Sequence, residues 1–173
     1  QSEAWSFEKL KKLYHHVEPG LIRVDADEVT YPLHVILRYR IEKALLSGDL
    51  AAADLPGAWN AGMKELLGVV PETVAMGCVQ DIHWPGGAIG YFPTYTMGAL
   101  AAAQFFSAAG DQIPDLNTQI EGGKFEPLMD WLNVNVHALG SFSTTDAVLE
   151  GATGAPLKTD AFKSHLKRRY LGD

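Results

Sequence analysis

A run of polar and aromatic side chains near the middle of the chain has the residue types that acid–base chemistry or transition-state stabilisation requires. Asp81 and His83 lie two residues apart, and Tyr91 and Tyr95 follow within the next dozen residues. The segment 77–96 is rich in glycine, which interrupts any helical period and lets the backbone approach a ligand closely. A purely structural interpretation is also open, in which Asp81 caps a helix, His83 bonds a buried carbonyl and the tyrosines belong to the core.

Arg23 is the second candidate, because it lies between apolar neighbours and close to the carboxylates of Asp25, Asp27 and Glu28. A guanidinium can bind a carboxylate through two parallel hydrogen bonds. That carboxylate can belong to a substrate or to the protein itself. From the residues alone, both a substrate anchor and an internal ion pair are therefore open.

Metal-binding and nucleophile motifs are not found in the sequence. A zinc helix typically carries H-E-x-x-H, and no such string occurs. His15 and His16 are adjacent, so on a helix they point about 100° apart and cannot hold one ion. There is also no phosphate-binding Walker loop and no G-x-S-x-G turn, and the apolar neighbours of Cys78 predict a buried thiol. We therefore expect no metal site within this chain.

The elements that position these residues are predicted to be helices. Apolar residues recur at intervals of three and four, and no convincing alternation typical of strands is present, so the predicted fold class is all-α. Residues 21–24 are either extended or a helical lead-in, and 71–96 is predicted to be a long, functional loop. The predicted helices cover residues 2–16, 27–47, a segment around 59–67, 99–109, 115–121, 125–139, 145–150 and 160–170.

Composition limits the possible classes of protein. A chain of 173 residues and 18.8 kDa predicts a single domain over 1–173. The formal net charge of −7 argues against a nucleic-acid partner, which needs a concentrated positive field. No apolar stretch approaches the roughly 18 residues that a membrane span needs. The single Cys78 excludes an intrachain disulfide, and no signal peptide is recognisable at Gln1, so we expect a cytoplasmic location.

Three segments, in the same order and spacing, resemble motifs of one family. Residues 22–31 are similar to I-R-x-x-A-D-E-[LV]-T-Y, and residues 77–84 to G-x-x-Q-D-x-H-W. Residues 152–157 are similar to A-T-G-x-P-L. Residues 90–98, which lie between the last two motifs, also resemble this family. Together they resemble the thermostable carboxypeptidases of the carboxypeptidase Taq family over about residues 17–171.

The resemblance implies a metal-dependent carboxypeptidase that releases the C-terminal residue of a peptide with a free C-terminus. The family's fold is a helical, zincin-like metallopeptidase with a long cleft, and its enzymes form homodimers. Its metal, zinc or cobalt, is held by H-E-x-x-H and a further Glu that lie upstream of the segment seen here. This chain therefore resembles the C-terminal part of such an enzyme, forms the helical half of its cleft and binds no metal through its own residues.

The same resemblance implies roles for individual residues. Arg23 matches the position expected to bind the substrate's α-carboxylate. His83 and Tyr91 match the pair that related long-cleft zinc peptidases, such as angiotensin-converting enzyme, direct at the oxyanion. Tyr95 is expected to contact the substrate and is an alternative to Tyr91 as the phenol for the oxyanion role. Gln80 and Asp81 are expected to orient these groups without contacting the substrate.

The chain departs from the family pattern at a few positions. Asp25 replaces the usual Glu, Ala99 and Ala101 stand where a polar residue and Tyr are frequent, and residues 138–139 replace a basic residue and His. Two other functions are considered. The first is a non-enzymatic helical interaction domain that lost the catalytic half and self-associates through exposed apolar surface. The second, a small hydrolase using Asp81 and His83, lacks a nucleophile or metal.

Overall fold

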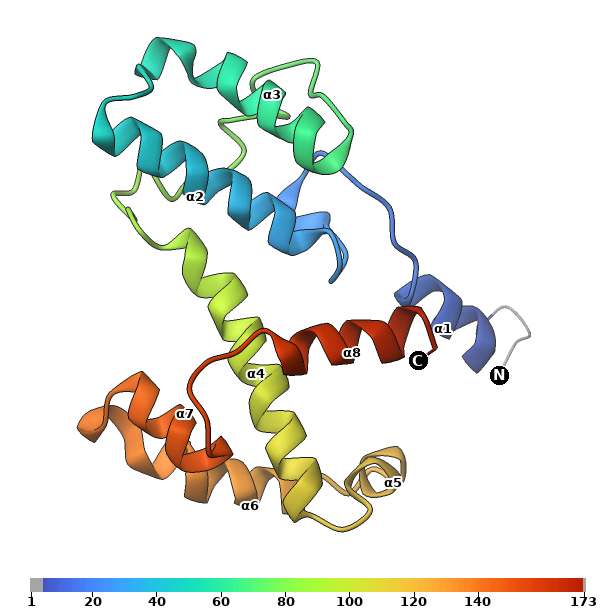
Figure 1. Cartoon of the computed structure of the whole chain (residues 1–173). Coiled ribbons are helices and arrows are strands. Elements are labelled where there is room, and N and C mark those ends of the chain that lie inside the picture. Colours follow the sequence, from blue (N-terminus) through green and yellow to red (C-terminus); the bar gives the residue numbers. More distant parts are fainter. Residues whose placement is uncertain (1–4, 173) are drawn as a thin grey trace. The chain divides into compact units, whose positions relative to one another are not determined.

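The computed structural model describes residues 5–172, and these residues form helices, turns and loops without a β-strand. The all-α prediction is confirmed. The helices are α1 (Phe7–Tyr14), α2 (Tyr31–Ser47), α3 (Leu55–Leu67), α4 (Phe92–Gln112), α5 (Leu116–Glu121), α6 (Glu126–Asn135), α7 (Thr145–Thr153) and α8 (Asp160–Tyr170), with 3₁₀ segments at Arg23–Asp25, Ala52–Asp54 and His137–Phe142 (Figure 1). Within residues 5–172, no helix is long and apolar enough to cross a bilayer.

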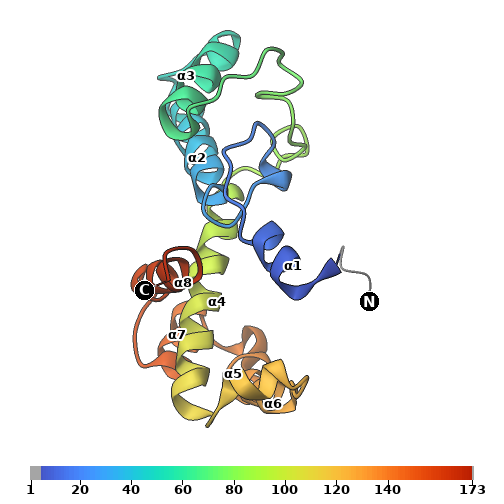
Figure 2. The ribbon, with the colours of Figure 1, turned by 90° about the vertical axis from the view of Figure 1, so that its right-hand side faces the viewer.

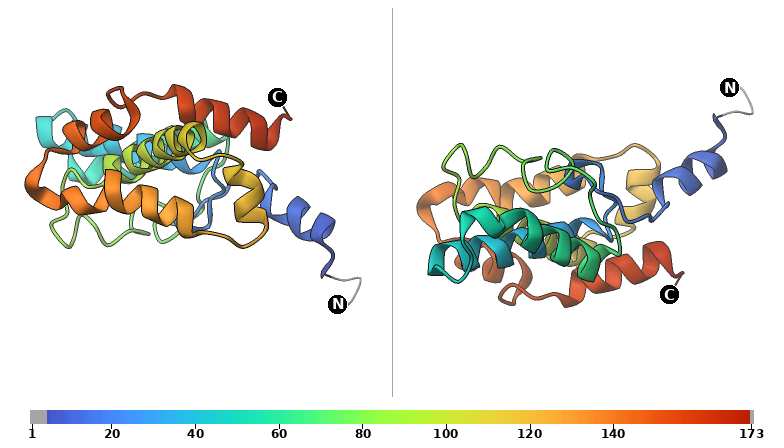
Figure 3. Two further views of the ribbon diagram at one scale, coloured as in Figure 1. Left: turned by 90° about the horizontal axis from the view of Figure 1, so that it is seen from below. Right: turned by 90° about the horizontal axis from the view of Figure 1, so that it is seen from above.

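The chain forms two compact units, Gln1–Thr96 and Met97–Asp173, and the boundary falls within α4. The expectation of one domain over 1–173 stays a prediction. In the first unit, α2 and α3 lie side by side and run in opposite directions (Figures 1 and 2), and the right-hand view of Figure 3 shows the same pairing. In the second unit, α6 contacts α7 and the 3₁₀ segment that follows α6.

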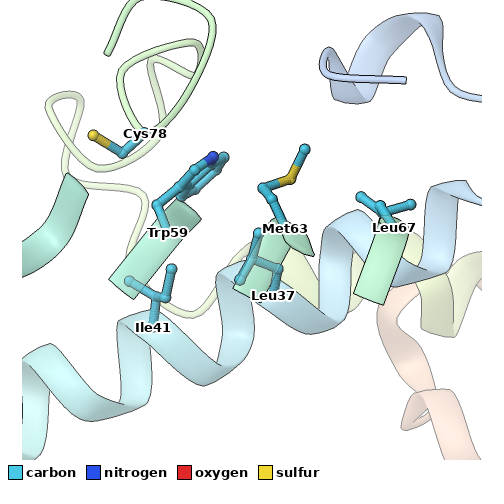
Figure 4. Close-up of a cluster of buried hydrophobic side chains, with 6 residues drawn as sticks. All are labelled: Leu37, Ile41, Trp59, Met63, Leu67 and Cys78. Atoms are coloured by element: carbon cyan, nitrogen blue, oxygen red, sulfur yellow. The ribbon is translucent and has the colours of Figure 1, made fainter. Parts of the chain in front are cut away.

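The core of the first unit lies between α2 and α3. Leu37 and Ile41 on α2 face three side chains of α3, and Cys78 reaches the same cluster from the following loop (Figure 4). The thiol of Cys78 is free and buried, as its neighbours predict. The α3 contribution consists of Trp59, Met63 and Leu67, which recur every four residues on one face of the helix and are almost fully buried.

Gln104 on α4 forms hydrogen bonds with the segment of the second unit that is similar to A-T-G-x-P-L. Its side-chain amide donates to Thr153 Oγ1 and to the carbonyls of Ala155 and Pro156, and its Oε1 accepts from the backbone N–H of Lys158. One buried side chain thus satisfies four polar groups of the connection from α7 to α8. This segment has a structural role in the second unit.

Two predicted boundaries of α4 are wrong. Residues 92–96 belong to the helix and not to the loop, because Pro93 fits the first turn, where its missing N–H costs nothing. The helix predicted to end at residue 109 continues through Gly110 and Asp111 to Gln112. The side chain of Gln112 accepts a hydrogen bond from Trp131 Nε1 at 2.8 Å, and this contact between α4 and α6 extends the helix past the glycine.

Other boundaries shift by a few residues. Asp27 accepts from the backbone N–H groups of Val29 and Thr30, both at 2.9 Å, so this turn precedes α2, which begins at Tyr31 instead of residue 27. Residues 21–24 lead into a 3₁₀ turn. Helix α6 is shorter than 125–139 and α7 is longer than 145–150, whereas 160–170 matches α8. The predicted start of the first helix at Ser2 lies outside the described residues.

Candidate active site

Three polar side chains follow one another along the buried face of α2. His34, Arg38 and Glu42 are four residues apart, so they lie on the same face of the helix, and all three are buried. Arg38 and Glu42 both reach the loop that follows α3. Buried polar groups need partners, and the loop provides them for Arg38 and Glu42, whereas neither ring nitrogen of His34 has a hydrogen-bond partner among residues 5–172.

Asp81 is at the centre of a buried ion-pair cluster. Its Oδ1 accepts from Nε and NH2 of Arg23, at 3.0 and 2.8 Å, and its Oδ2 accepts from Nε of Arg38 at 2.6 Å. Burial alone would raise the pKa of Asp81, but the hydrogen bonds and charges of the two arginines outweigh burial and lower it. The carboxylate is therefore ionised in the folded protein, and two guanidiniums share its charge.

Gln80 connects the loop to the segment that carries Arg23. Its Oε1 accepts from the backbone N–H of Arg23 and from NH2 of Arg38, both at 2.9 Å. Its amide nitrogen lies 3.1 to 3.2 Å from the carbonyl oxygens of Leu21, Met76 and Gly77. Gln80 thus fixes the position of Arg23 through backbone contacts.

The Arg23 guanidinium lies beneath aromatic rings. Its central carbon is 5.0 Å from the centre of the Tyr95 ring, and NH1 donates to the hydroxyl of Tyr31 at 2.7 Å. Burial works to lower the pKa of Arg23, but the bond and charge of Asp81 dominate and raise it. The bonds to Asp81 and Tyr31 use three of the five N–H donors of this buried side chain.

His83 packs among the rings of α4 and the residue before it. Its Nε2 is 2.9 Å from the hydroxyl of Tyr95, and its ring centre is 4.4 Å from that of Phe92 and 5.7 Å from that of Tyr91. Its Nδ1 is buried, lies 3.9 Å from Oδ1 of Asp81, and has no hydrogen-bond partner among residues 5–172. Tyr91 is about half exposed, so this side of the cluster faces solvent.

The first unit brings together all six residues that the sequence suggested, namely Arg23, Gln80, Asp81, His83, Tyr91 and Tyr95. Sequence reasoning missed Arg38, Glu42 and Phe92, and did not assign a role to Tyr31. The recurrence of charged residues at intervals of four on α2 was the available signal, but the apolar period of the same helix concealed it.

The described residues do not fit a metal ion. Within residues 5–172, no group of three or more His, Cys, Asp or Glu side chains is placed to hold one. The nearest candidates, Asp81 and His83, are engaged with Arg23 and Tyr95.

Comparison with known proteins defines the family. The model of the family described as carboxypeptidase Taq (M32) metallopeptidase matches residues 1–170. This chain belongs to that family. The resemblance of the three sequence motifs to this metallopeptidase family is thereby confirmed.

Relatives of this M32 chain are much longer than the chain itself. Thermostable carboxypeptidase 1 of Thermus thermophilus is 44% identical over 154 residues, which are 89% of this chain and 30% of the relative. Carboxypeptidase 1 of Bacillus subtilis is 38% identical, with 95% of this chain and 33% of the relative covered. The solved structure of Trypanosoma cruzi metallocarboxypeptidase 1 superposes with a TM-score of 0.95 at 40% identity, covering 99% of this chain and 36% of that one. The chain spans about a third of the length of these relatives.

The buried histidine of this M32 chain makes its stability depend on pH. Burial, and then the charges of Arg38 and Arg23, lowers the pKa of His34 from 6.5 to about 4. His34 binds a proton near pH 6.5 in the unfolded chain but only near pH 4 in the folded chain. The free energy of unfolding therefore falls as the pH decreases through this window. We expect this group to reduce the unfolding free energy by about 3 kcal/mol between pH 7 and 4, as measured by urea denaturation.

A matched pair of variants isolates that contribution. His34→Leu removes the titrating group, so its unfolding free energy should depend less steeply on pH, whatever its value at pH 7. His137→Gln changes an exposed histidine of the second unit and should keep the original slope. Equal slopes in the parent chain and His34→Leu would contradict the prediction.

Proposed function

We propose that this chain supplies the substrate-carboxylate and transition-state-stabilising side of the cleft in a metallocarboxypeptidase that releases C-terminal residues from peptides. The observation that carries the proposal is the convergence of Arg23, Asp81, His83, Tyr91 and Tyr95 in one cluster. Here "parent protein" means a polypeptide of the length of the M32 relatives that contains this chain. The activity proposed is that of the parent protein.

Arg23 is proposed to bind the free α-carboxylate of the peptide. Asp81 is shared between Arg23 and Arg38, and the other buried carboxylate of this row, Glu42, bonds Trp84 and Gly90 and not Arg23. The guanidinium of Arg23 therefore keeps a positive charge that attracts an anion. Two N–H donors of Arg23 remain beyond its bonds to Asp81 and Tyr31. A carboxylate that accepts from them would be recognised by charge and by direction.

His83 and Tyr91 are proposed to donate hydrogen bonds to the oxyanion that develops when the peptide carbonyl is attacked. Tyr95 already bonds Nε2 of His83, so its most direct contribution is to orient the imidazole and to cover Arg23 at the substrate side. The half-exposed Tyr91 has capacity for a new partner, and Nε2 of His83 would share the oxyanion with the Tyr95 hydroxyl, because Nδ1 is buried beside Asp81. Donors aimed at developing charge contribute about 3 to 4 kcal/mol each in a water-excluded site.

The metal of the parent protein, zinc or cobalt, is proposed to be held by residues outside this chain. It would supply the activation of the attacking water. The residues of this chain then bind and orient the substrate, and the chain alone is expected to be inactive. From the resemblance and the single buried Cys78, we also propose that the parent protein is a cytoplasmic homodimer.

Arg23→Lys in the parent protein tests this function. Lysine keeps the positive charge beside Asp81 but loses the planar fork, so we expect kcat/KM for peptides with a free C-terminus to decrease by about 10- to 100-fold. The assay follows release of the C-terminal residue from a peptide and from its amidated form. Arg40→Lys, which alters an exposed arginine paired with Glu65, is the control and should change little. Equal cleavage of acid and amide by the unmodified enzyme would rule out the role of Arg23.

A further inference from the structure

Glu42 connects the two ends of the loop that separates His83 from Tyr91. Its Oε2 accepts from the indole N–H of Trp84 at 2.7 Å, and its Oε1 accepts from the backbone N–H of Gly90 at 2.7 Å. Trp84 directly follows His83, and Gly90 directly precedes Tyr91. The Glu42 carboxylate therefore bonds the residue next to His83 and the residue next to Tyr91, which are the two groups proposed to donate to the oxyanion.

Backbone bonds and ring packing also hold the loop, but they act mainly within the loop and toward α4. The loop is closed by short backbone bonds, from Gly86 N–H to the Ile82 carbonyl at 3.0 Å and from Ala88 N–H to the His83 carbonyl at 2.8 Å. These bonds shape the His83 side of the loop. At the far end, Gly90 N–H bonds Glu42 of α2, in a backbone conformation with φ of 77° that favours glycine, and Phe92 nearby packs against Arg38 of the same helix.

Arg38 and Glu42, both on α2, bond residues that lie before and after His83 in the sequence. Arg38 bonds Asp81, two residues before the imidazole, and Glu42 bonds Trp84, one residue after it. A regular helix is a rigid base, and its two side chains are one turn apart. The imidazole is thus held between two fixed points on one helix.

We propose that Glu42 is a positioning residue of the candidate active site, which sets the placement of His83 and Tyr91 through Trp84 and Gly90. It is buried and lies behind the loop, so it acts through its neighbours and not on substrate. This inference rests on the proposed function, because positioning has kinetic consequences only where His83 and Tyr91 stabilise the oxyanion.

A carboxylate is required because both contacts are N–H donors. Glutamate offers two acceptor oxygens, whereas glutamine offers one, and its NH₂ group would face a second donor. Glu42→Gln keeps the size of the side chain and loses at least one of the two contacts. A misplacement of about 1 Å can cost up to about 100-fold in rate.

The test measures kinetics of the parent protein on a free-acid peptide. We expect Glu42→Gln to lower kcat by roughly 10- to 100-fold and to change KM less than about threefold, because the Arg23 anchor is untouched. Glu65→Gln, at an exposed glutamate of α3, is the matched control and should retain the kinetics. A fall in activity that only follows the loss of folded protein, measured by circular dichroism, would overturn the proposal.

A second readout follows the hydrogen bond itself. The indole N–H of Trp84, assigned in an NMR spectrum by its loss in Trp84→Phe, should exchange slowly with solvent in the unmodified protein and faster in Glu42→Gln. Unchanged exchange would also overturn the proposal. Trp84→Phe removes one contact and leaves the Gly90 bond, so its kcat should decrease less than that of Glu42→Gln.

The two proposals can fail separately. If His83→Ala leaves kcat unchanged, the oxyanion role fails, and the positioning role of Glu42 fails with it. If His83→Ala lowers kcat while Glu42→Gln does not, the oxyanion role stands and the Glu42 proposal is wrong.

Discussion

Replacing His83 by alanine in the parent protein is expected to lower kcat by about 100- to 1,000-fold. The imidazole contacts the Tyr95 hydroxyl through Nε2 and lies beside the half-exposed Tyr91, so its Nε2 edge is the one proposed to face a new negative charge. A donor that acts only when that charge develops changes kcat more than KM. Steady-state kinetics on a free-acid peptide measure both constants.

His137→Ala is the control for this experiment. His137 lies in the second unit, and its Nδ1 contacts the side chain of Asn133 on the surface. We expect its kcat to stay within about twofold of the unmodified enzyme, since exposed substitutions rarely affect more than local stability. If His83→Ala and His137→Ala had the same kcat, His83 would have no part in the reaction.

Asp81→Asn is expected to lower the free energy of unfolding by about 3 to 5 kcal/mol. The carboxylate is the shared partner of two arginines whose side chains are 7% and 0% exposed, so its removal leaves two buried positive charges uncompensated. Asparagine can accept with one oxygen only, and its amide hydrogens would face a guanidinium. Urea denaturation at pH 7 measures the difference.

The effect should depend on pH as well as on the substitution. The pKa of Asp81 is below its usual 3.8, so its contribution is present above that pH and is lost as the pH falls through the lower, folded value. Asp130→Asn, at an exposed position of α6, should change stability by less than about 0.5 kcal/mol. A loss of under about 1 kcal/mol in Asp81→Asn would show that the cluster does not stabilise the first unit.

The sequence predicted the elements better than it predicted their ends. Apolar spacing identified α2 and α3 because their core residues recur along one face, and α3 ends at Gly68, with φ of 74°, next to the predicted limit at residue 67. The ends of α4 were missed because contacts distant in sequence decide them, such as the bond between Gln112 and Trp131. Local propensity contains no information on such contacts.

The sequence predicted the site residues that lie in the loops, but it did not predict those on helix α2. Asp81, His83 and Arg23 stand out by type and by resemblance, whereas Arg38 and Glu42 lie between apolar positions of α2 and were not singled out. Only the folded chain shows that this polar row is buried and faces the loop. For Arg23, the residues left a substrate anchor and an internal ion pair open. The ion pair with Asp81 is formed, and binding of a substrate carboxylate stays a proposal.

The most direct test of the central claim compares this chain with the parent protein in one assay. Both are loaded with zinc or cobalt, and mass spectrometry follows release of the C-terminal residue from a free-acid peptide. We predict release by the parent protein and none by the 173-residue chain, because its described residues provide no metal site. Release by the chain alone at the rate of the parent protein, abolished by a chelator, would contradict the claim.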